Sequence, residues 1–408
     1  MRITSTSMCR RPGVRLLAVA AATGLVMTTA APSPSLALSS RPLGAPAEAE
    51  GTIPDRLRDD VRAVRATGVV GVLGEVGTGS RRTVARSGVA DRRTKEAMPP
   101  NGHFRIGSTT KTFVATVVLQ LAGEGRLSLD DTVEKWLPGV VRGNGNDGRE
   151  ITVRQLLQHT SGIPEYLRPA TSPEQWRRER SRTWRPEQLV ALAVRKKPSF
   201  APGAEWGYSN TNYVLAGMII RRVTGRGWDE EVERRVLTPL GLRHTLIPGA
   251  DPRLPAPHAR AYARFTPDGA LTDVTEHDQT LGDAAGAMIS TTGDLNRFFR
   301  ALLGGRLLPP AQLAEMKKTV PAKALRAMGV TGAAYGLGLM YRPLSCGGGY
   351  WGHGGDEIGF STRVGVTADG GRGVAVETTS RSLADLRAAQ RTNQALSALV
   401  DHALCGAA

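Results

Sequence analysis

The fold is decided around Phe104-Arg105-Ile106-Gly107-Ser108-Thr109-Thr110-Lys111-Thr112-Phe113, which leads into the largely apolar run 114–122. Residues three apart on a helix are neighbours, so Ser108 and Lys111 are expected to lie side by side. In a first helical turn the serine lies beside N–H groups without helical partners, at the positive end of the dipole. Apolar surroundings should desolvate the lysine and lower its pKa, which favours a nucleophile beside its base. The alternative is a capping serine and a surface lysine.

A second polar group occurs in Gly207-Tyr208-Ser209-Asn210-Thr211-Asn212-Tyr213, just before an apolar helical pattern. A tyrosine close to a lysine can relay a proton, and an asparagine can both donate to and accept from a substrate amide. Tyr208 and Asn210 are therefore candidate site residues. The alternative is a helix N-cap preceded by a packed aromatic side chain.

The third group is Tyr350-Trp351-Gly352-His353-Gly354-Gly355-Asp356, a predicted strand that ends in glycines. Glycines allow a substrate backbone to approach a strand edge, and His353 can supply a hydrogen-bond donor near physiological pH. A hairpin turn with a structural histidine is the alternative. The Gly-x-Gly-x-x-Gly at 347–352 lacks a strand–helix context, which argues against dinucleotide binding.

Ser-x-x-Lys at 108–111, Tyr-Ser-Asn at 208–210 and His-x-Gly at 353–355 together resemble the motifs of the serine penicillin-recognising hydrolases. The sequence looks closest to secreted D-alanyl-D-alanine carboxypeptidases and class C beta-lactamase-like proteins. Five further stretches resemble that family: 151–162 (ITVRQLLQHTSG), 201–203 (APG), 285–290 (AGAMIS), 335–339 (YGLGL) and 344–347 (LSCG). The resemblance covers about residues 55–406.

The resemblance implies a role for each matching residue. Ser108 is expected to form an acyl-enzyme, with Lys111 as its base or proton shuttle. Tyr208 is expected to pass the proton to the leaving group and later to activate the hydrolytic water, and Asn210 to hold the acyl amide. The N–H groups of Ser108 and Asp356 are expected to form an oxyanion hole, a contact worth about 3–4 kcal/mol in a transition state.

The glycine-rich strand is expected to bind substrate through His353, Gly354, Gly355 and Asp356. The histidine stands where most relatives have a lysine. No glutamate loop of the class A type is evident, which leaves Tyr208 as the expected deacylation base.

Three positions depart from the carboxypeptidase pattern. Relatives of that type tend to have threonine at the positions of Gly354 and Asp356 and arginine at Met340, groups that hold a substrate's terminal carboxylate. An ionised carboxylate within about 6 Å of that group would cost roughly 2–3 kcal/mol at an effective dielectric near 20. We therefore expect Asp356 to weaken binding of free-carboxylate peptides unless Arg342 or Arg363 compensates.

The N-terminus has the pattern of an export signal. Arg2, Arg10, Arg11 and Arg15 precede the apolar run 16–31, and small residues at 35–37 suit signal peptidase. We expect a signal peptide at 1–37 and a linker at 38–51, which would leave a secreted, extracellular protein. An uncleaved anchor is the alternative. Removing four arginines lowers the formal charge from +16 to +12, and no stretch reaches the 20 or so apolar residues of a stable membrane span.

Cysteine usage agrees with export. The chain has 3 cysteines; Cys9 would leave with the signal, and the remaining pair, Cys346 and Cys405, is expected to form a disulfide in an oxidising compartment. The alternative is two separate buried thiols.

The pattern of apolar runs predicts an α/β layer made from both ends of the chain, with a mainly α-helical inserted subdomain between them. The family resemblance implies that this layer is an antiparallel sheet flanked by helices, as in the beta-lactamase/transpeptidase-like fold. Residues 52–107 and 286–406 are expected to form the α/β subdomain and residues 108–285 the helical one. The apolar patterns place helices at 53–67, 153–159, 186–195, 212–224, 292–304, 310–316 and 383–404, and strands at 69–76, 83–89, 349–353, 359–367 and 373–379.

These features predict a secreted serine hydrolase, foremost a D-alanyl-D-alanine carboxypeptidase-type peptidase acting on a peptidoglycan-type D-alanyl peptide or a related amide or ester. The resemblance implies beta-lactams as covalent ligands. The alternatives are an esterase, a class C-like beta-lactamase and a low-turnover penicillin-binding protein. No cofactor or metal is expected. The arginine- and tryptophan-rich segment 176–185 is expected to roof the site rather than bind nucleic acid.

Overall fold

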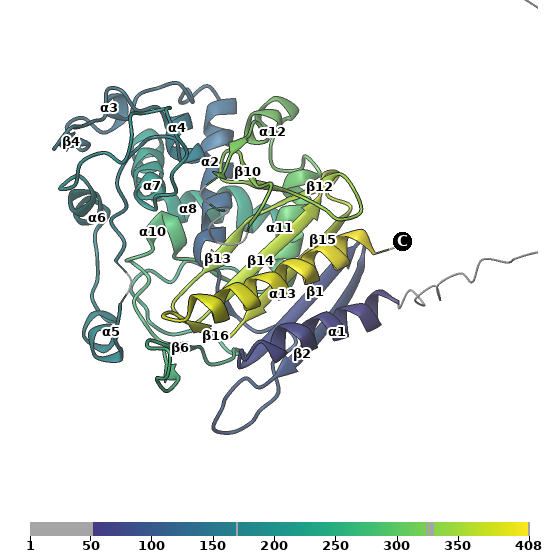
Figure 1. The fold of residues 1–408 in the computed structure, drawn as a ribbon. Coiled ribbons are helices and arrows are strands. Elements are labelled where there is room, and N and C mark those ends of the chain that lie inside the picture. Colours follow the sequence, from purple (N-terminus) through teal and green to yellow (C-terminus); the bar gives the residue numbers. More distant parts are fainter. Residues whose placement is uncertain (1–51, 169, 324, 326–329, 407–408) are drawn as a thin grey trace, which may run out of the picture. The chain divides into compact units, whose positions relative to one another are not determined.

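An antiparallel sheet made from both ends of the chain lies at the centre of the fold (Figure 1). The computed structural model describes residues 52–168, 170–323, 325 and 330–406. Within these residues the sheet has nine strands in the order β2-β1-β15-β14-β12-β11-β10-β9, and β13 pairs with β14. Their bounds are Gly71–Thr78 (β1), Arg81–Gly88 (β2), Val320–Pro321 (β9), Ala334–Tyr335 (β10), Met340–Pro343 (β11), Gly349–Gly352 (β12), Gly354–Asp356 (β13), Ser361–Thr367 (β14) and Arg372–Thr378 (β15).

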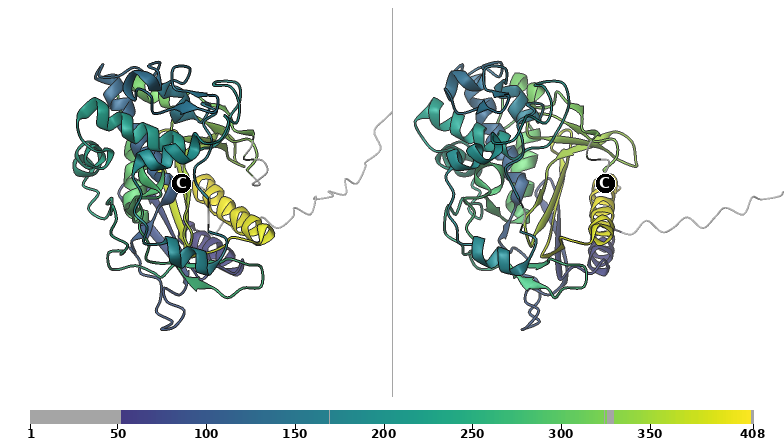
Figure 2. Two further views of the ribbon diagram at one scale, coloured as in Figure 1. Left: turned by 90° about the vertical axis from the view of Figure 1, so that its left-hand side faces the viewer. Right: turned by 60° about the vertical axis from the view of Figure 1, so that its left-hand side comes forward.

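The register of β1 explains how the sheet joins two layers of helices. A Cβ on Gly74 would lie 3.1–3.8 Å from Val61, Leu57 and Leu399, so this face of β1 packs on helices α1 (Ile53–Ala66) and α13 (Leu386–Cys405). The next residue, Glu75, points to the other face and accepts a hydrogen bond from Thr292 at 2.8 Å, in α11 (Thr292–Leu303). Because side chains alternate along a strand, β1 serves both layers (Figure 2).

The predicted disulfide is present. Cys346 and Cys405 are bonded at 2.03 Å and join the end of α13 to the loop between β11 and β12. Closing a loop of this length stabilises a fold by roughly 4 kcal/mol in the chain-entropy view.

Helix α2 (Thr110–Gly123) is the axis of the helical layer. It is buried on nearly all sides, which fits its almost uniformly apolar sequence, and it packs against α7 (Thr211–Thr224). The other helices of the described residues are α3 (Val133–Trp136), α4 (Val153–Gln158), α5 (Pro173–Glu179), α6 (Pro186–Ala193), α8 (Trp228–Val232), α9 (Thr238–Leu240), α10 (Asp283–Gly286) and α12 (Pro310–Met316). Short strands form smaller sheets: β3 (Phe104–Arg105), β4 (Arg142–Gly143), β5 (Asn146–Asp147), β6 (Tyr262–Arg264), β7 (Thr272–Asp273), β8 (Ile289–Ser290) and β16 (Ser380–Ser382).

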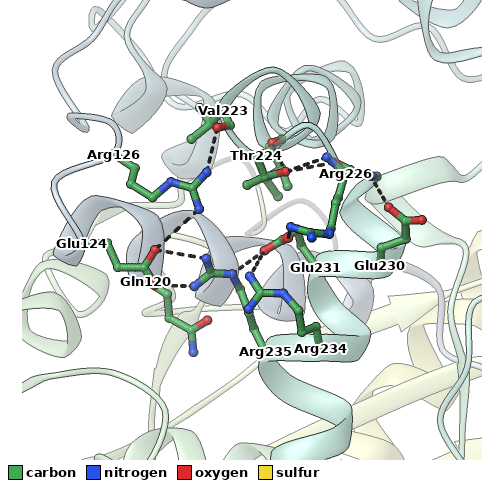
Figure 3. Close-up of polar contacts among 12 residues, drawn as sticks. Gln120, Glu124, Arg126, Val223, Thr224, Arg226, Glu230, Glu231, Arg234 and Arg235 are labelled. Carbon is green, nitrogen blue, oxygen red and sulfur yellow. Dashed lines mark hydrogen bonds and ion pairs between the residues drawn. The ribbon is translucent and has the colours of Figure 1, made fainter.

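An ionic cluster fixes the far end of α2 (Figure 3). Glu231 of α8 is fully buried, and its carboxylate forms ion pairs with Arg234 at 2.8 Å, with Arg226 at 3.9 Å and with Arg235. Arg235 also pairs with Glu124, the C-cap residue of α2. Burial raises the pKa of Glu231, but hydrogen bonds from Arg235 and Arg234 outweigh it and the net pKa is lowered.

Most predicted elements are found within one to three residues of their expected bounds. The strand predicted at 349–353 is β12, but one correction concerns 350–356, predicted as one strand ending in glycines: the structure divides it into β12 and β13, with His353 between them. The final helix begins at Leu386 because the Asp385 side chain caps it, accepting from the Ala388 N–H at 3.0 Å.

The expected signal peptide at 1–37 and linker at 38–51 lie outside the described residues. The described residues belong to one compact unit, so the predicted boundary between subdomains at 107 and 108 stays a prediction. None of the helices in the described part of the chain is both long and apolar enough to cross a membrane.

Candidate active site

Ser108 lies in one turn of 3-10 helix, Gly107–Thr109, that continues directly into α2. Gly107 has a φ of +50°, and a Cβ there would lie 3.0 Å from the backbone nitrogen of Asp356. Glycine meets both demands, a left-handed backbone and a close approach by β13. The serine therefore sits in a first helical turn, as the sequence predicted.

Lys111 is fully buried beside the serine. Its Nζ lies 2.9 Å from Ser108 Oγ, 2.7 Å from Asn210 Oδ1 and 2.6 Å from the carbonyl oxygen of Ala285. Burial lowers the pKa of Lys111 from 10.5 to about 7, because only the more distant charges of Glu165 and Glu357 oppose it. A large share of the lysine is therefore neutral at neutral pH.

The hydrogen bonds of Lys111 define where its lone pair points once it is neutral. Asn210 Oδ1 and the Ala285 carbonyl oxygen can only accept, so each takes one N–H of the amine. Ser108 Oγ carries a proton and is the remaining partner. The lone pair is thus directed at the serine hydroxyl, the geometry that a general base requires.

Tyr208 completes this group. Its ring centroid lies 4.9 Å from Lys111 Nζ. Burial raises the pKa of Tyr208 above its usual range, although a hydrogen bond with Ser108 acts in the opposite direction. The phenol is therefore protonated at neutral pH and serves as a donor. Behind it, the buried His159 ring lies 4.2 Å away and accepts from the Ser209 N–H at 3.3 Å, which holds the tyrosine segment in place.

Asn210 is oriented by a carboxylate that sequence reasoning missed. Glu165 Oε2 accepts from the Asn210 backbone N–H at 2.8 Å and from its Nδ2 at 2.9 Å. This fixes the amide so that Oδ1 faces Lys111 and one N–H of Nδ2 remains for a substrate carbonyl. Glu165 lies three residues beyond the family-like stretch 151–162, and only this proximity could have drawn attention to it.

The backbone of Asp356 reaches the nucleophile as expected. The Glu357 N–H donates to the Phe360 carbonyl at 2.9 Å, and hydrogen-bonded pairs alternate along an antiparallel ladder. The Asp356 N–H therefore points away from β14, toward Gly107 and Ser108. The Ser108 N–H belongs to the first helical turn, so the nucleophile has two N–H donors in neighbouring residues that could stabilise an oxyanion.

Gly355 has a packing role within the protein rather than a contact with the substrate. A Cβ there would lie 1.8 Å from the Ile106 carbonyl oxygen and 3.0 Å from Thr109 Oγ1. The glycine is what lets β13 approach the turn of the nucleophile. Gly354 lies beside it and lines a cavity next to Ser108, where the sequence placed a substrate contact.

The expectation that His353 supplies a donor to the substrate is corrected by the structure. The ring is buried, and burial lowers its pKa to about 3, so it is neutral. Nδ1 lies 2.6 Å from the Gly354 carbonyl, which can only accept, so Nδ1 carries the proton. Nε2 then accepts from the Tyr335 hydroxyl at 2.8 Å. Both nitrogens are engaged within the protein, and His353 acts by positioning β13.

The side chain of Asp356 is ionised and paired. Burial raises its pKa, but the charges of Arg363 and Arg381 outweigh this and hold the pKa far below its usual range. Its oxygens lie 3.1 Å from Arg363 Nη1 and 3.8 Å from Arg381 Nη2. Arg363 therefore compensates the charge, as considered from the sequence, while Arg342 donates elsewhere, to Ser397 at 3.3 Å.

Two cavities meet at Ser108. One, of about 230 Å³, extends past Asn210 toward Tyr166, Trp176 and Glu357. The other, of about 290 Å³, extends past Tyr208. Its remaining lining includes Met340, Arg342, His353 and Asp356. The side near Asn210 suits an acyl group, and the side near Tyr208, which holds the proton donor, suits a leaving group. Helix α5 contributes Trp176 to the first cavity, in agreement with the roofing segment predicted at 176–185.

Comparisons with known proteins agree with this geometry. A family model described as Beta-lactamase matches residues 57–399. A D-stereospecific amidohydrolase from Streptomyces sp. is 42% identical with a TM-score of 0.77, covering 87% of this chain and 99% of that one. The D-amino acid amidase from Ochrobactrum anthropi SV3, complexed with L-phenylalanine amide, is 28% identical with a TM-score of 0.72, covering 85% and 99%.

Penicillin-binding protein 4* of Bacillus subtilis (strain 168) is 28% identical over 232 residues, which are 53% of this chain and 48% of that protein. The chain spans less than half of the length of the curated relatives it matches.

Proposed function

The chain belongs to the beta-lactamase family and is a serine hydrolase, and from this premise we propose that it hydrolyses amides of D-amino acids through an acyl-enzyme on Ser108. The amidase relatives support the substrate class. The contact between Lys111 Nζ and Ser108 Oγ at 2.9 Å supports the chemistry.

Acylation begins with the neutral form of Lys111. Its lone pair takes the Ser108 proton as Oγ attacks the amide carbonyl, and the oxyanion is stabilised by the N–H groups of Ser108 and Asp356. Tyr208 donates its proton to the leaving nitrogen and recovers one from the Lys111 ammonium, so the amine leaves neutral and the lysine returns to its basic form.

Deacylation reverses these transfers with water in place of the amine. Tyr208 and Lys111 together accept the proton of the attacking water. Because the pKa of Tyr208 is raised, a free phenolate is disfavoured and the proton passes on to the lysine. Ser108 is then regenerated.

The carboxylate of Asp356 is the observation that favours an amide over a free acid. It lines both cavities beside Ser108 and is held ionised by Arg363 and Arg381. A substrate with a terminal carboxylate would meet this charge, whereas a neutral amide would not. Both arginines are already engaged by Asp356.

The test compares four substrates: D-phenylalanine amide, its L-enantiomer, a D-Ala-D-Ala peptide and the C-terminal amide of that peptide. We expect kcat/KM to favour the D-amide over the L-amide and the blocked peptide over the free acid. A clear preference for the free-acid peptide would overturn the assignment.

A D-alanyl peptidase is the second candidate, and the 290 Å³ cavity past Tyr208 favours it. Ammonia needs no cavity of this size, whereas a leaving amino acid residue would fill it. Labelling with a fluorescent penicillin separates the remaining alternatives. Rapid loss of the label indicates a beta-lactamase, slow loss a low-turnover penicillin-binding protein, and absence of label argues against penicillin recognition.

We also propose that the protein acts outside the cytoplasm. The Cys346–Cys405 disulfide supports this, because such bonds persist in oxidising compartments. Immunoblots of culture medium and cell lysate test it, and a full-length protein confined to the lysate would contradict it.

A further inference from the structure

We propose that Glu357 selects the substrate: its carboxylate binds a positively charged group on the acyl part, namely the α-ammonium of an unblocked amino acid amide. This inference rests on the proposed function and names the residue that would distinguish a free amino acid amide from an N-acylated one.

Glu357 is held firmly next to the oxyanion site. It follows Asp356 in the turn between β13 and β14, its N–H donates to the Phe360 carbonyl at 2.9 Å, and its own carbonyl accepts from Arg381 Nη1 at 2.8 Å. Its side chain lines the 230 Å³ cavity that also contains Ser108. The backbone of Glu357 is therefore held in place, and its carboxylate lies on the acyl side of the nucleophile.

The carboxylate has no cationic partner among the described residues. The ion pair recorded for it there is with His277, whose Nε2 lies 3.5 Å from Oε2. Burial, followed by the charge of Arg105, lowers the pKa of His277, so the ring is neutral. Its Nδ1 lies 3.3 Å from the Val274 carbonyl oxygen, and its Nε2 lies 2.7 Å from Gln279 Nε2. A neutral His277 offers the carboxylate no positive charge.

The arginines of the same cavity do not fill this role. Arg168, Arg180 and Arg182 are exposed residues, and the latter two lie over the rings of Trp176 and Trp184. Arg381 is closer, but its guanidinium faces the carboxylate of the preceding residue and the Glu357 carbonyl oxygen. Because the Glu357 side chain is only 19% exposed, water compensates its charge incompletely.

The position of the carboxylate fits an α-ammonium. Oε1 lies 3.6 Å from the Cβ position of Gly286, the residue after Ala285, whose carbonyl binds Lys111. The α-nitrogen of an acyl group is two bonds from the carbonyl carbon that Ser108 attacks. A substrate ammonium between Oε1 and the nucleophile would supply the missing cation, and charge-assisted hydrogen bonds of this kind are strong.

The test measures kcat/KM for D-phenylalanine amide and for N-acetyl-D-phenylalanine amide with the wild type, Glu357→Gln and Glu150→Gln. The last variant removes an exposed acid that lines neither cavity beside Ser108 and serves as the matched control. We expect Glu357→Gln to lower kcat/KM for the free amide by about 10- to 100-fold and to change it less than about threefold for the acetylated amide. The control is expected to leave both unchanged.

The acetylated substrate also controls for an indirect effect. The Glu357 charge raises the pKa of Lys111, and a changed Lys111 pKa would alter kcat/KM for both substrates alike. Equal losses on the two amides would mean that Glu357 acts on the chemistry, and no loss on either would mean that it binds nothing; both outcomes overturn the inference. If the wild type cleaves neither amide but forms an acyl-enzyme with penicillin, the proposed function fails. The inference then fails as well, but the penicillin acyl-enzyme distinguishes this outcome from a failure of the inference alone.

Discussion

Lys111 and Glu231 are both fully buried ionisable side chains, yet they have opposite fates. Around Lys111 the contacting atoms are neutral oxygens, carboxylates act only from a distance, and burial lowers its pKa to about 7. Around Glu231, arginines contact the carboxylate and outweigh burial. Burial alone therefore does not make a group reactive. A buried group becomes reactive when the protein withholds its counter-ion, and structural when the counter-ion is supplied.

The largest effect is expected from removing the nucleophile. Ser108→Ala should lower amide hydrolysis at least about 10³-fold, because no other group can form the acyl-enzyme. It should also abolish the mass increase seen after incubation with a penicillin. Ser80→Ala, in the exposed turn after β1, is the control. A variant lacking Ser108 that still gains the penicillin mass would place the nucleophile elsewhere.

The two buried charges should separate function from stability. Lys111→Met should abolish acylation while leaving the free energy of unfolding unchanged or raised by about 1–3 kcal/mol, since an unpaired buried charge is removed. Glu231→Gln should lower that free energy by about 1–3 kcal/mol and leave kcat/KM unchanged, because the arginines lose their partner far from the site. Urea unfolding and substrate kinetics measure both, and a marked destabilisation by Lys111→Met would refute the contrast.

A smaller effect is expected at Glu165, which positions Asn210 and whose charge raises the pKa of Lys111. Glu165→Gln should lower kcat about 10-fold and move the midpoint of the pH–rate profile to lower pH. A purely structural role would leave that midpoint in place. Glu150→Gln again serves as the control.

The smallest effect is expected at Asp356. Asp356→Asn should raise the kcat/KM of a free-acid D-Ala-D-Ala peptide relative to its amide by about 3- to 10-fold, because Arg363 and Arg381 already screen part of the charge. An unchanged ratio of the two kcat/KM values would show that the Asp356 side chain does not determine this specificity.

The sequence predicted the parts of the site that are local. Ser108 and Lys111 are adjacent because helix geometry alone places them so, and the apolar run after them already indicated a desolvated amine. Tyr208 and Asn210 were found because their spacing resembles a family pattern. The positions of the long strands followed from periodicity and turn residues.

The parts that failed depend on contacts between distant segments. Glu165 is a loop residue whose role exists only once it faces Asn210, 45 positions away. His353 was expected to be a donor because its partner Tyr335, on another strand, was not considered, and burial between strands removes its charge. The short strands β10 and β11 carry too few residues to show an alternating pattern.

The pH dependence of acylation tests the central claim, that a desolvated Lys111 activates Ser108. The second-order rate constant for labelling by an uncharged ester substrate should rise as the lysine loses its proton, with an inflection near pH 7 and a plateau above it, because only the neutral amine can accept the serine proton. An inflection near pH 10, where an ordinary lysine titrates, or a rate independent of pH from 5 to 9, would contradict the account.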